Sequence, residues 1–244
     1  MAGIVKFLLW ILIIILLIAG LAAWLSPAGG VNTRSRDIRV IEWIRNAEDH
    51  PDWAVKAGQR CAAAPFIVPT DGYIGYLWDD SFRPGHRHQG IDIFSGSQVG
   101  ETPVYAAADG YLTRQADWKS SLIIRLPDDP LQPGRQIWLY YTHLANAQGN
   151  SLIADSFPPG SQEVFVQAGD RLGYQGNYSG TPGQPVGVHL HFSIVLDDGQ
   201  GRYLNELEIE NTLDPSPYLG LNLNARQNQE EIPLCSLESQ GGQP

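Results

Sequence analysis

Short apolar segments between residues 66 and 219 constrain the fold of this 244-residue chain more than any other feature. The segments are rich in Val, Ile, Leu and Tyr, and glycine, proline and Asp-Gly pairs separate them. Short segments of this kind, bounded by turn residues, predict β-strands rather than long helices. In chain order they read GYIGYLW, GIDIF, TPVYAAADGYL, LIIRL, QIWLYYTHL, EVFVQAGDRLGYQG and VHLHFSIVL. The sequence therefore predicts a mainly antiparallel β architecture.

The charge balance argues against nucleic acid as a partner. The chain has 26 acidic and 16 basic residues, which gives a formal net charge of −10. Proteins that bind a phosphate backbone do so with clustered Lys and Arg, and this sequence contains no such cluster. Hydrophobic residues make up 43% of the chain, which is enough for a core and excludes disorder throughout.

Residues 7–25 form an uncharged apolar segment, FLLWILIIILLIAGLAAWL. A helix of this length reaches about 28 Å, close to the hydrocarbon thickness of a bilayer. We expect a membrane anchor over residues 1–25, with a cleaved signal peptide and a buried helix as the alternatives. Lys6 precedes the segment and arginines follow it at residues 34–45, so the positive-inside rule favours a cytoplasmic C-terminal region.

Residues 26–60 predict a linker followed by a short helical stalk. SPAGGVNT is rich in turn residues, and Ile38, Ile41 and Ile44 then recur at helical spacing with charged residues between them. Pro51 is expected to end this helix. The helix either projects as a stalk or packs on the following domain.

Two cysteines, Cys61 and Cys235, lie near opposite ends of the region after the linker. They belong to no C-x-x-C pair, which argues against a zinc or redox motif of that type. The ends of a domain often lie close together, so the two thiols can pair as a disulfide in an oxidising compartment. Two separate buried thiols are the alternative.

Five of the six histidines fall in three short strings, GHRHQGIDI, YYTHLA and VHLHFSI. Histidine and carboxylate are the usual ligands of a catalytic zinc, which takes three protein ligands and leaves a fourth position for water. The alternation in VHLHFSI predicts a strand with His189 and His191 on one face. His88 and Asp92 would lie about 13 Å apart on a straight strand, so we expect a bend or bulge at Gly90.

The strings HQGIDIFSG, TPVYAAADGYL, YYTHLA, GDRLGYQGNYSG and VHLHFSI have the order and approximate spacing of the lysostaphin-type peptidases. The chain resembles this family of zinc endopeptidases, which cut peptide bonds in peptidoglycan, over about residues 66–197. The resemblance implies a sandwich-like antiparallel β domain with an open groove at residues 61–225. An irregular tail is expected at residues 226–244.

Position by position, the resemblance implies that His88, Asp92 and His191 bind Zn²⁺ and that His143 and His189 are catalytic. It implies a monomeric zinc metalloendopeptidase that acts on stem peptides or cross-bridges of peptidoglycan. No H-E-x-x-H motif is present, so histidine rather than glutamate is the expected base. A non-catalytic peptidoglycan-binding or regulatory module of the same fold is the alternative, and a zinc hydrolase acting on other proteins stays open.

The sequence departs from the family pattern in two places. Gly187 and Val188 stand where the family usually has Gly-Pro, and residues 145–164 look longer than the usual connection. We expect both segments on the groove walls, where they affect substrate choice. His86 has no counterpart and is either an exposed groove-edge residue or a group that contacts substrate or metal, whereas His50 is expected to be a solvated residue at the end of the helix.

The resemblance also bears on localisation. Peptidoglycan lies outside the cytoplasmic membrane, so we expect an extracytoplasmic domain on a single-pass anchor, or a secreted one if the anchor is cleaved. A disulfide between Cys61 and Cys235 would belong to the same compartment. The arginines after the apolar segment argue the other way, but large domains can override that bias.

Overall fold

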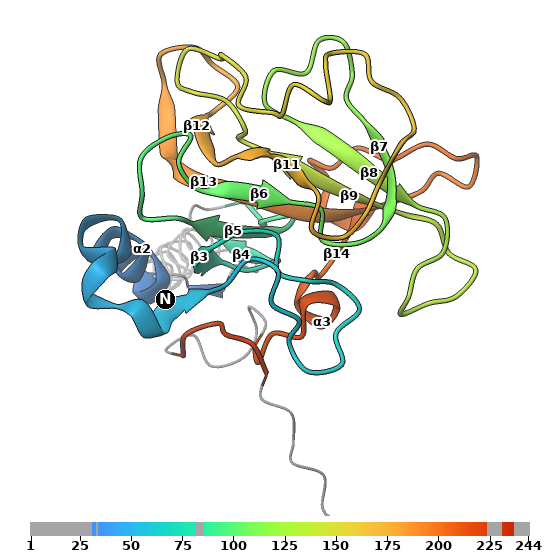
Figure 1. Ribbon diagram of the computed structural model, residues 1–244. Coiled ribbons are helices and arrows are strands. Elements are labelled where there is room, and N and C mark those ends of the chain that lie inside the picture. Colours follow the sequence, from blue (N-terminus) through green and yellow to red (C-terminus); the bar gives the residue numbers. More distant parts are fainter. Residues whose placement is uncertain (1–30, 33, 82–84, 224–230, 237–244) are drawn as a thin grey trace, which may run out of the picture.

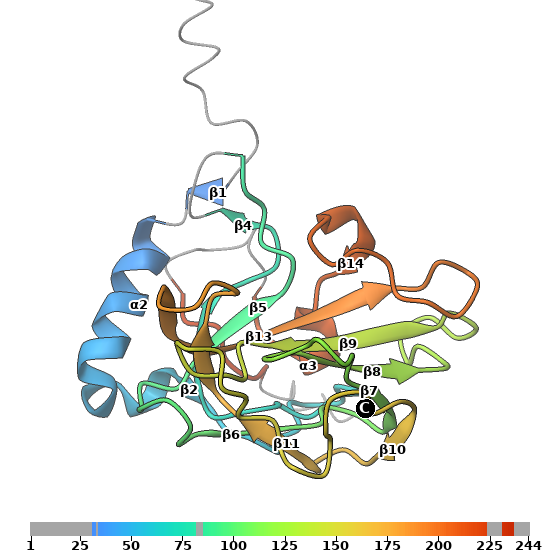
Figure 2. The same ribbon diagram turned by 90° about the horizontal axis from the view of Figure 1, so that it is seen from above.

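The computed structural model describes residues 31–32, 34–81, 85–223 and 231–236, seen from two directions in Figures 1 and 2. In chain order the elements are β1 (Val31–Asn32), α2 (Arg34–Asn46), η1 (Ala47–Asp49), η2 (Pro51–Trp53), β2 (Ala54–Val55), β3 (Gly72–Tyr76), β4 (Asp80–Ser81), β5 (Ile91–Phe94), β6 (Pro103–Tyr105), β7 (Gly110–Thr113), β8 (Leu122–Leu126), β9 (Ile137–Thr142), β10 (Val164–Val166), β11 (Arg171–Tyr174), β12 (Gly176–Tyr178), β13 (Pro185–Leu196), η3 (Ile209–Asn211), β14 (Thr212–Leu213) and α3 (Ser216–Leu219). Strands predominate among these elements, so the prediction of a mainly antiparallel β fold is confirmed.

Ten strands form one sheet with the order β10-β7-β8-β9-β13-β5-β3-β2, and β12 and β14 also pair with β13. The pairings within this sheet are antiparallel. The 12-residue strand β13 pairs with β5 along one edge and with β9 along the other. Residues at one level of β5, β13 and β9 are therefore neighbours, and the candidate site lies on these three strands.

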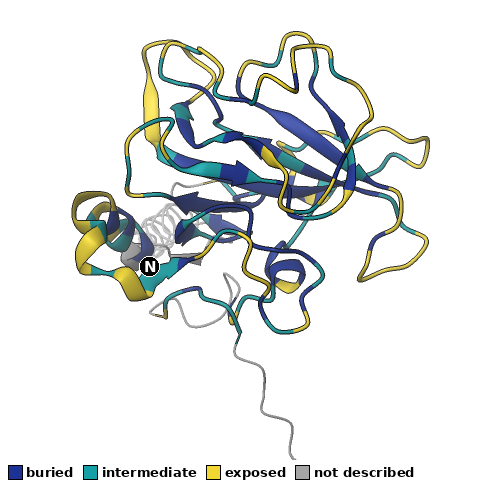
Figure 3. Cartoon of the chain, viewed as in Figure 1, coloured by how far each residue is buried: buried dark blue, intermediate teal, exposed yellow. Residues whose placement is uncertain are grey.

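The apolar segments supply the core of this sheet, as expected. Ile74 of β3, Ile93 of β5, Tyr141 of β9 and Phe192 of β13 are fully buried, and the central strands are dark blue in Figure 3. LIIRL forms β8 in full, whereas EVFVQAGDRLGYQG is divided into β10 and β11. The division falls at a turn that contains Gly169, whose positive φ of 93° is readily adopted by glycine.

The helix expected after the linker is present as α2, and it packs against the sheet (Figures 1 and 2). Trp43 is 4% exposed, and its Nε1–H donates to the carbonyl of Phe94 at 2.7 Å. A Cβ on Gly75 of β3 would lie 2.4 Å from Cγ2 of Val40, so the helix lies directly on the strand. The packed alternative is therefore correct. The α-helix ends at Asn46, before the proline that was expected to end it.

The two cysteines form a disulfide, Cys61–Cys235, across a sequence separation of 174. Leu221 forms a bridge with Cys235 beside it, so the described part of the tail is held against the domain. Among the residues with described positions, no helix is long and apolar enough to cross a membrane. The apolar segment at residues 7–25 and most of the tail at residues 226–244 lie outside the described residues.

Candidate metal and catalytic site

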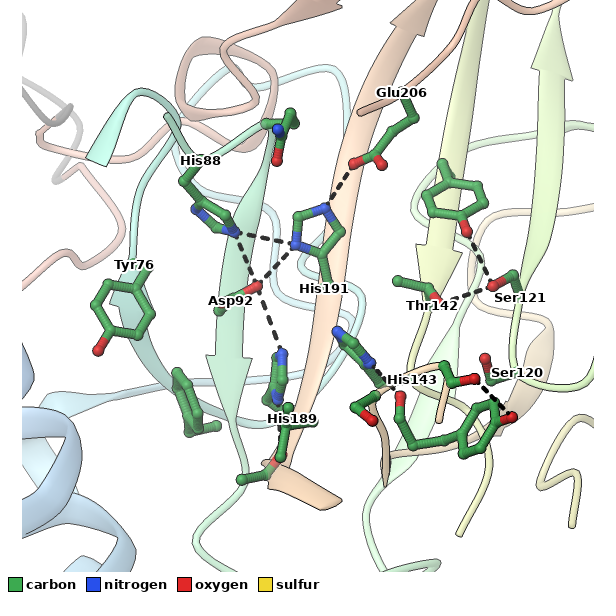
Figure 4. A pocket seen from close by; sticks show the side chains of 18 of the residues that line it. Tyr76, His88, Asp92, Ser120, Ser121, Thr142, His143, His189, His191 and Glu206 are labelled. Carbon is green, nitrogen blue, oxygen red and sulfur yellow. Dashed lines mark hydrogen bonds and ion pairs between the residues drawn. The ribbon is translucent and has the colours of Figure 1, made fainter. Parts of the chain in front are cut away.

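The five histidines of the three strings line one cleft of about 790 Å³. Figure 4 shows this cleft and labels His88, His143, His189 and His191. Asp92 lies on β5, and His189 and His191 lie on β13. His88 precedes β5 and His143 follows β9. Strands that are adjacent in the sheet but distant in the sequence thus bring these side chains to one place.

His88, Asp92 and His191 bring three donor atoms together. Nε2 of His88 lies 3.0 Å from Nδ1 of His191 and 3.1 Å from Oδ1 of Asp92. Nδ1 of His191 and Oδ1 of Asp92 are 2.8 Å apart, because the two residues are directly paired across β5 and β13. Donors bonded to a tetrahedral zinc at about 2.0–2.1 Å lie about 3.3 Å from one another. The three donor atoms therefore need to move only slightly apart to bind one ion. All three residues are buried.

The expected bend at Gly90 is present and lies between the two ligand candidates of this segment. His88 lies in the connection before β5 and not on the strand, which removes the distance problem of a straight strand. A Cβ on Gly90 would lie 2.3 Å from the carbonyl oxygen of Phe192. Glycine is therefore required here because the chain approaches β13 closely.

The outer nitrogen of each histidine in this cluster is already hydrogen-bonded. Nδ1 of His88 donates to the carbonyl of Leu77 at 3.0 Å, and Nε2 of His191 donates to Oε1 of Glu206 at 2.8 Å. A carbonyl and a carboxylate only accept hydrogen bonds, so these bonds leave lone pairs on the nitrogens that face each other. Two lone pairs and a carboxylate oxygen in such close contact repel one another unless a proton or a metal ion lies between them. The donor set therefore fits a zinc ion.

The charges around the cluster favour a cation. Burial alone would raise the pKa of Asp92, but the surrounding histidines, His88 first, hold it well below its usual range. Burial likewise lowers the pKa of His191, but hydrogen bonds to Asp92 and Glu206 outweigh this and raise it to about 10. A proton and a metal ion therefore compete for the same nitrogen of His191.

His143 and His189 lie beside the cluster in a different setting. Nδ1 of His143 donates to the carbonyl of Tyr178 at 2.6 Å, and Nδ1 of His189 donates to the carbonyl of Gly187 at 2.7 Å. These bonds leave Nε2 of each ring with a lone pair, and the ring centroids are 4.4 Å apart. Burial and then the neighbouring histidine lower the pKa of His143 to about 3, and burial lowers that of His189. Both rings are therefore neutral at pH 7.

The backbone at His143 has a left-handed conformation, with φ of 71°. This conformation is uncommon for residues other than glycine, although histidine adopts it more often than most, and residues held in it cluster at functional sites. The backbone at His143 packs against β12, because a Cβ on Gly176 would lie 2.3 Å from the carbonyl oxygen of His143. The end of β9 and the start of β12 thus fix the direction of the His143 side chain.

The two remaining histidines lie apart from this chemistry. His86 lines the cleft, with its ring 6.5 Å from that of His88. His50 lies outside the cleft residues and is less solvated than expected, because its ring stacks on Trp53 at 3.9 Å. Glu206 was not predicted from the sequence, and it also accepts a hydrogen bond from Ser193 at 3.1 Å. Acidic residues recur around that position in NELEIE, so no local pattern distinguishes it.

The residues that line the cleft match only part of the set expected from the sequence. Val186 and Gly187 line the cleft, as expected for the segment before the histidines of β13. Residues 145–164, all of which have described positions, contribute nothing to the cleft lining, so that part of the expectation is wrong. These residues instead form the connection between β9 and β10. Asp37 and Ile44 of α2 line the cleft, which the sequence did not predict.

No protein-family model matches the sequence, and neither does any curated protein. Csd3 from Helicobacter pylori is 19% identical, with 63% of this chain and 34% of its own chain covered and a TM-score of 0.39. Lysostaphin in solution is 21% identical, with coverage of 67% and 55% and a TM-score of 0.37. A mutant catalytic domain of the prophage-encoded protein EnpA from Enterococcus faecalis is 20% identical, with coverage of 61% and 95% and a TM-score of 0.34. The match thus spans about a third of the Csd3 chain and about half of lysostaphin.

Proposed function

We propose that this chain is a zinc-dependent endopeptidase of the lysostaphin type that hydrolyses peptide bonds in peptidoglycan. One observation carries the proposal: three lone-pair donors face one another in a cleft beside two neutral histidines. His88, Asp92 and His191 are the proposed zinc ligands, and His143 and His189 are the proposed catalytic residues.

When bound, zinc polarises the carbonyl group of a peptide bond and lowers the pKa of water. The histidine pair supplies the proton transfers. Nε2 of His143 or His189 accepts a proton from the attacking water as its oxygen bonds to the carbonyl carbon. The resulting imidazolium stabilises the negative charge on the carbonyl oxygen and donates its proton to the amine as the C–N bond breaks. Both rings start neutral, which is the protonation state that a base requires.

The choice of peptidoglycan rests on the sequence resemblance together with the shape of the site. The five linked motifs occur in family order, and every position that the family uses for zinc or catalysis is occupied by the matching residue type. A cleft of about 790 Å³ suits a segment of peptide chain. A non-catalytic module of the same fold has no need of the complete set of five residues, and we therefore favour the enzyme.

We also propose that the apolar segment at residues 7–25 anchors the chain in the cell membrane and that a monomeric domain acts outside the cytoplasm. The Cys61–Cys235 disulfide supports this location, because disulfides persist in oxidising compartments. Protease added to wall-stripped cells should digest the domain. Resistance in wall-stripped cells followed by digestion after lysis would refute the outward orientation.

The test of the function is digestion of purified wall sacculi by the full chain, with mass spectrometry of the released peptides and measurement of zinc content. The expected result is about one zinc per chain and the release of peptides with new amino termini. The matched control is Asp92→Ala, which should release nothing. A wild-type chain that holds zinc but cuts other proteins and not sacculi would overturn the proposal that peptidoglycan is the substrate. A chain without zinc or hydrolysis would support the non-catalytic module.

A further inference from the structure

Helix α2 is a fixed part of the cleft. Arg36 is fully buried and lies 3.4 Å from Asp80, and Val40 and Trp43 pack in a cluster with Tyr73 and Phe94. These contacts attach the helix to β3 and β5, the strands on one side of the candidate site. A helix held by buried contacts presents its cleft side in one position, as substrate recognition requires.

The side of α2 that faces the cleft is mainly apolar. Val40 and Ile44 line it together with Phe94 and Val186. Cδ1 of Ile44 would lie 3.3 Å from a Cβ on Gly187, so the isoleucine reaches the start of β13. This apolar wall, defined by these four lining residues, begins next to the catalytic pair.

The apolar wall is in direct contact with one of the proposed catalytic histidines, His189. The ring of Phe94 stacks on that of His189 at 4.8 Å, and Gly187 accepts the hydrogen bond from the same histidine. Another part of the cleft lining carries hydroxyl groups instead, from Ser121, Tyr140 and Thr142. Tyr140 and Thr142 belong to β9, on the other side of β13. A peptide that crosses the site therefore meets the apolar wall, together with the hydrogen-bonded pair of Asp37 and Tyr76, on one side and hydroxyl groups on the other.

We propose that the apolar wall is a subsite for one aliphatic side chain of the substrate, next to the bond that is cut. This inference rests on the proposed function and names the feature of the substrate that the cleft selects. Ile44 is the specificity-determining residue, because it lines the cleft and its terminal carbon lies close to Gly187, so its side chain limits the size of the group that this part of the cleft accepts. Ile44 is 46% exposed, so a bound side chain would cover a surface that is otherwise in water.

The test compares Ile44→Ala with Ile41→Ala in the full chain. Ile41 has the same side chain on the same helix and is 50% exposed, but it does not line the cleft. The probes are pentaalanine and peptides with leucine in place of one alanine at each position in turn. Dissociation constants are measured by calorimetry on the zinc-free proteins, and kcat and KM are measured on the zinc-loaded ones.

Ile44→Ala should improve binding of at least one leucine peptide relative to pentaalanine by about tenfold, because a few methylene groups change specificity by about that factor. The change should appear in KM more than in kcat, with zinc content unaltered. Ile41→Ala should shift the ratio of the dissociation constants for the leucine peptide and pentaalanine by less than about twofold. An unchanged ratio in Ile44→Ala, or an equal shift in both variants, overturns the subsite. If no variant hydrolyses any peptide but the binding ratio shifts as described, the subsite stands and the proposed peptidase activity fails.

Discussion

The two halves of the candidate site place the same side chain in opposite electrostatic settings. In the metal half, carboxylates overcome the effect of burial and raise the pKa of His191 to about 10. In the catalytic half, burial lowers the pKa of His143 to about 3. The outer ring nitrogen of His191 donates to the carboxylate of Glu206, and that of His143 donates to the backbone carbonyl of Tyr178.

For His191 and His143, the charge of the hydrogen-bond partner accounts for the opposite shifts in pKa, whereas the proposed ligand His88 donates to the backbone carbonyl of Leu77. A carboxylate partner adds negative charge, so the ring attracts a proton or a metal ion to its other nitrogen. A backbone carbonyl fixes the tautomer without adding a full charge, so the buried rings of His143 and His189 stay neutral and keep a lone pair for proton transfer. Each of the following predictions tests one side of this comparison.

The largest effect is expected from loss of a zinc ligand. His88→Ala, Asp92→Ala and His191→Ala should each remove most of the zinc and all measurable hydrolysis, because two remaining ligands cannot hold a catalytic zinc tightly. Metal analysis and the sacculus assay on each purified variant measure this. Near-stoichiometric zinc in Asp92→Ala would refute the ligand assignment.

Loss of a catalytic histidine should separate activity from metal binding. His143→Ala and His189→Ala should keep zinc and lose about 10² to 10⁴-fold in rate, the usual contribution of a positioned acid or base. His50→Ala is the control, since His50 packs on Trp53 outside the cleft residues, and it should cost almost nothing. If His189→Ala loses zinc while His191→Ala retains it, the two histidines of β13 have exchanged roles.

A smaller effect is expected at the carboxylate that orients a ligand. Glu206→Ala should weaken zinc binding by about 10- to 100-fold, the typical cost of losing such a partner. Glu206→Gln retains an acceptor for Nε2 of His191 and should lose less. Competition with a chelator of known affinity measures both, and Glu208→Ala is the control because Glu208 accepts hydrogen bonds from Asn205 and Asn211 instead. Equal zinc affinity in all three variants would show that the hydrogen bond to Glu206 has no influence on the metal.

The last prediction concerns the pH dependence of stability, which involves neither zinc affinity nor rate. Folding lowers the pKa of His143 from 6.5 to about 3, so between these values the unfolded chain binds more protons than the folded one. This histidine therefore stabilises the fold least at low pH: its contribution is complete above pH 6.5 and is lost as the pH falls toward 3, by at most about 1.4 kcal/mol per pH unit.

The variant His143→Asn isolates this contribution, because asparagine tolerates the left-handed backbone and can still donate to the carbonyl of Tyr178. Urea unfolding of both proteins between pH 3 and pH 7 should show a shallower pH dependence in the variant. Groups common to both proteins cancel in the difference between the two curves. Parallel curves would contradict the lowered pKa of His143.

Local pattern was sufficient to predict the strands and the candidate ligands. The apolar segments became β3, β5, β8, β9 and β13 because each is long enough to bury its side chains in a sheet. Alternation along β13 places His189 and His191 toward one site, and the bend at Gly90 brings His88 toward Asp92. Such relations extend over only a few residues, so chain geometry determines them.

Other features depended on contacts between distant residues. The sequence allowed a free stalk or a packed helix, and the bond from Trp43 to the carbonyl of Phe94 shows that α2 packs. It allowed two free thiols or a disulfide, and the structure joins Cys61 to Cys235. Glu206 is one of several acidic residues in its segment, and only the approach of its loop to β13 pairs it with His191. Side-chain type states which bonds are chemically available, but the three-dimensional path of the chain decides which partners come within bonding distance.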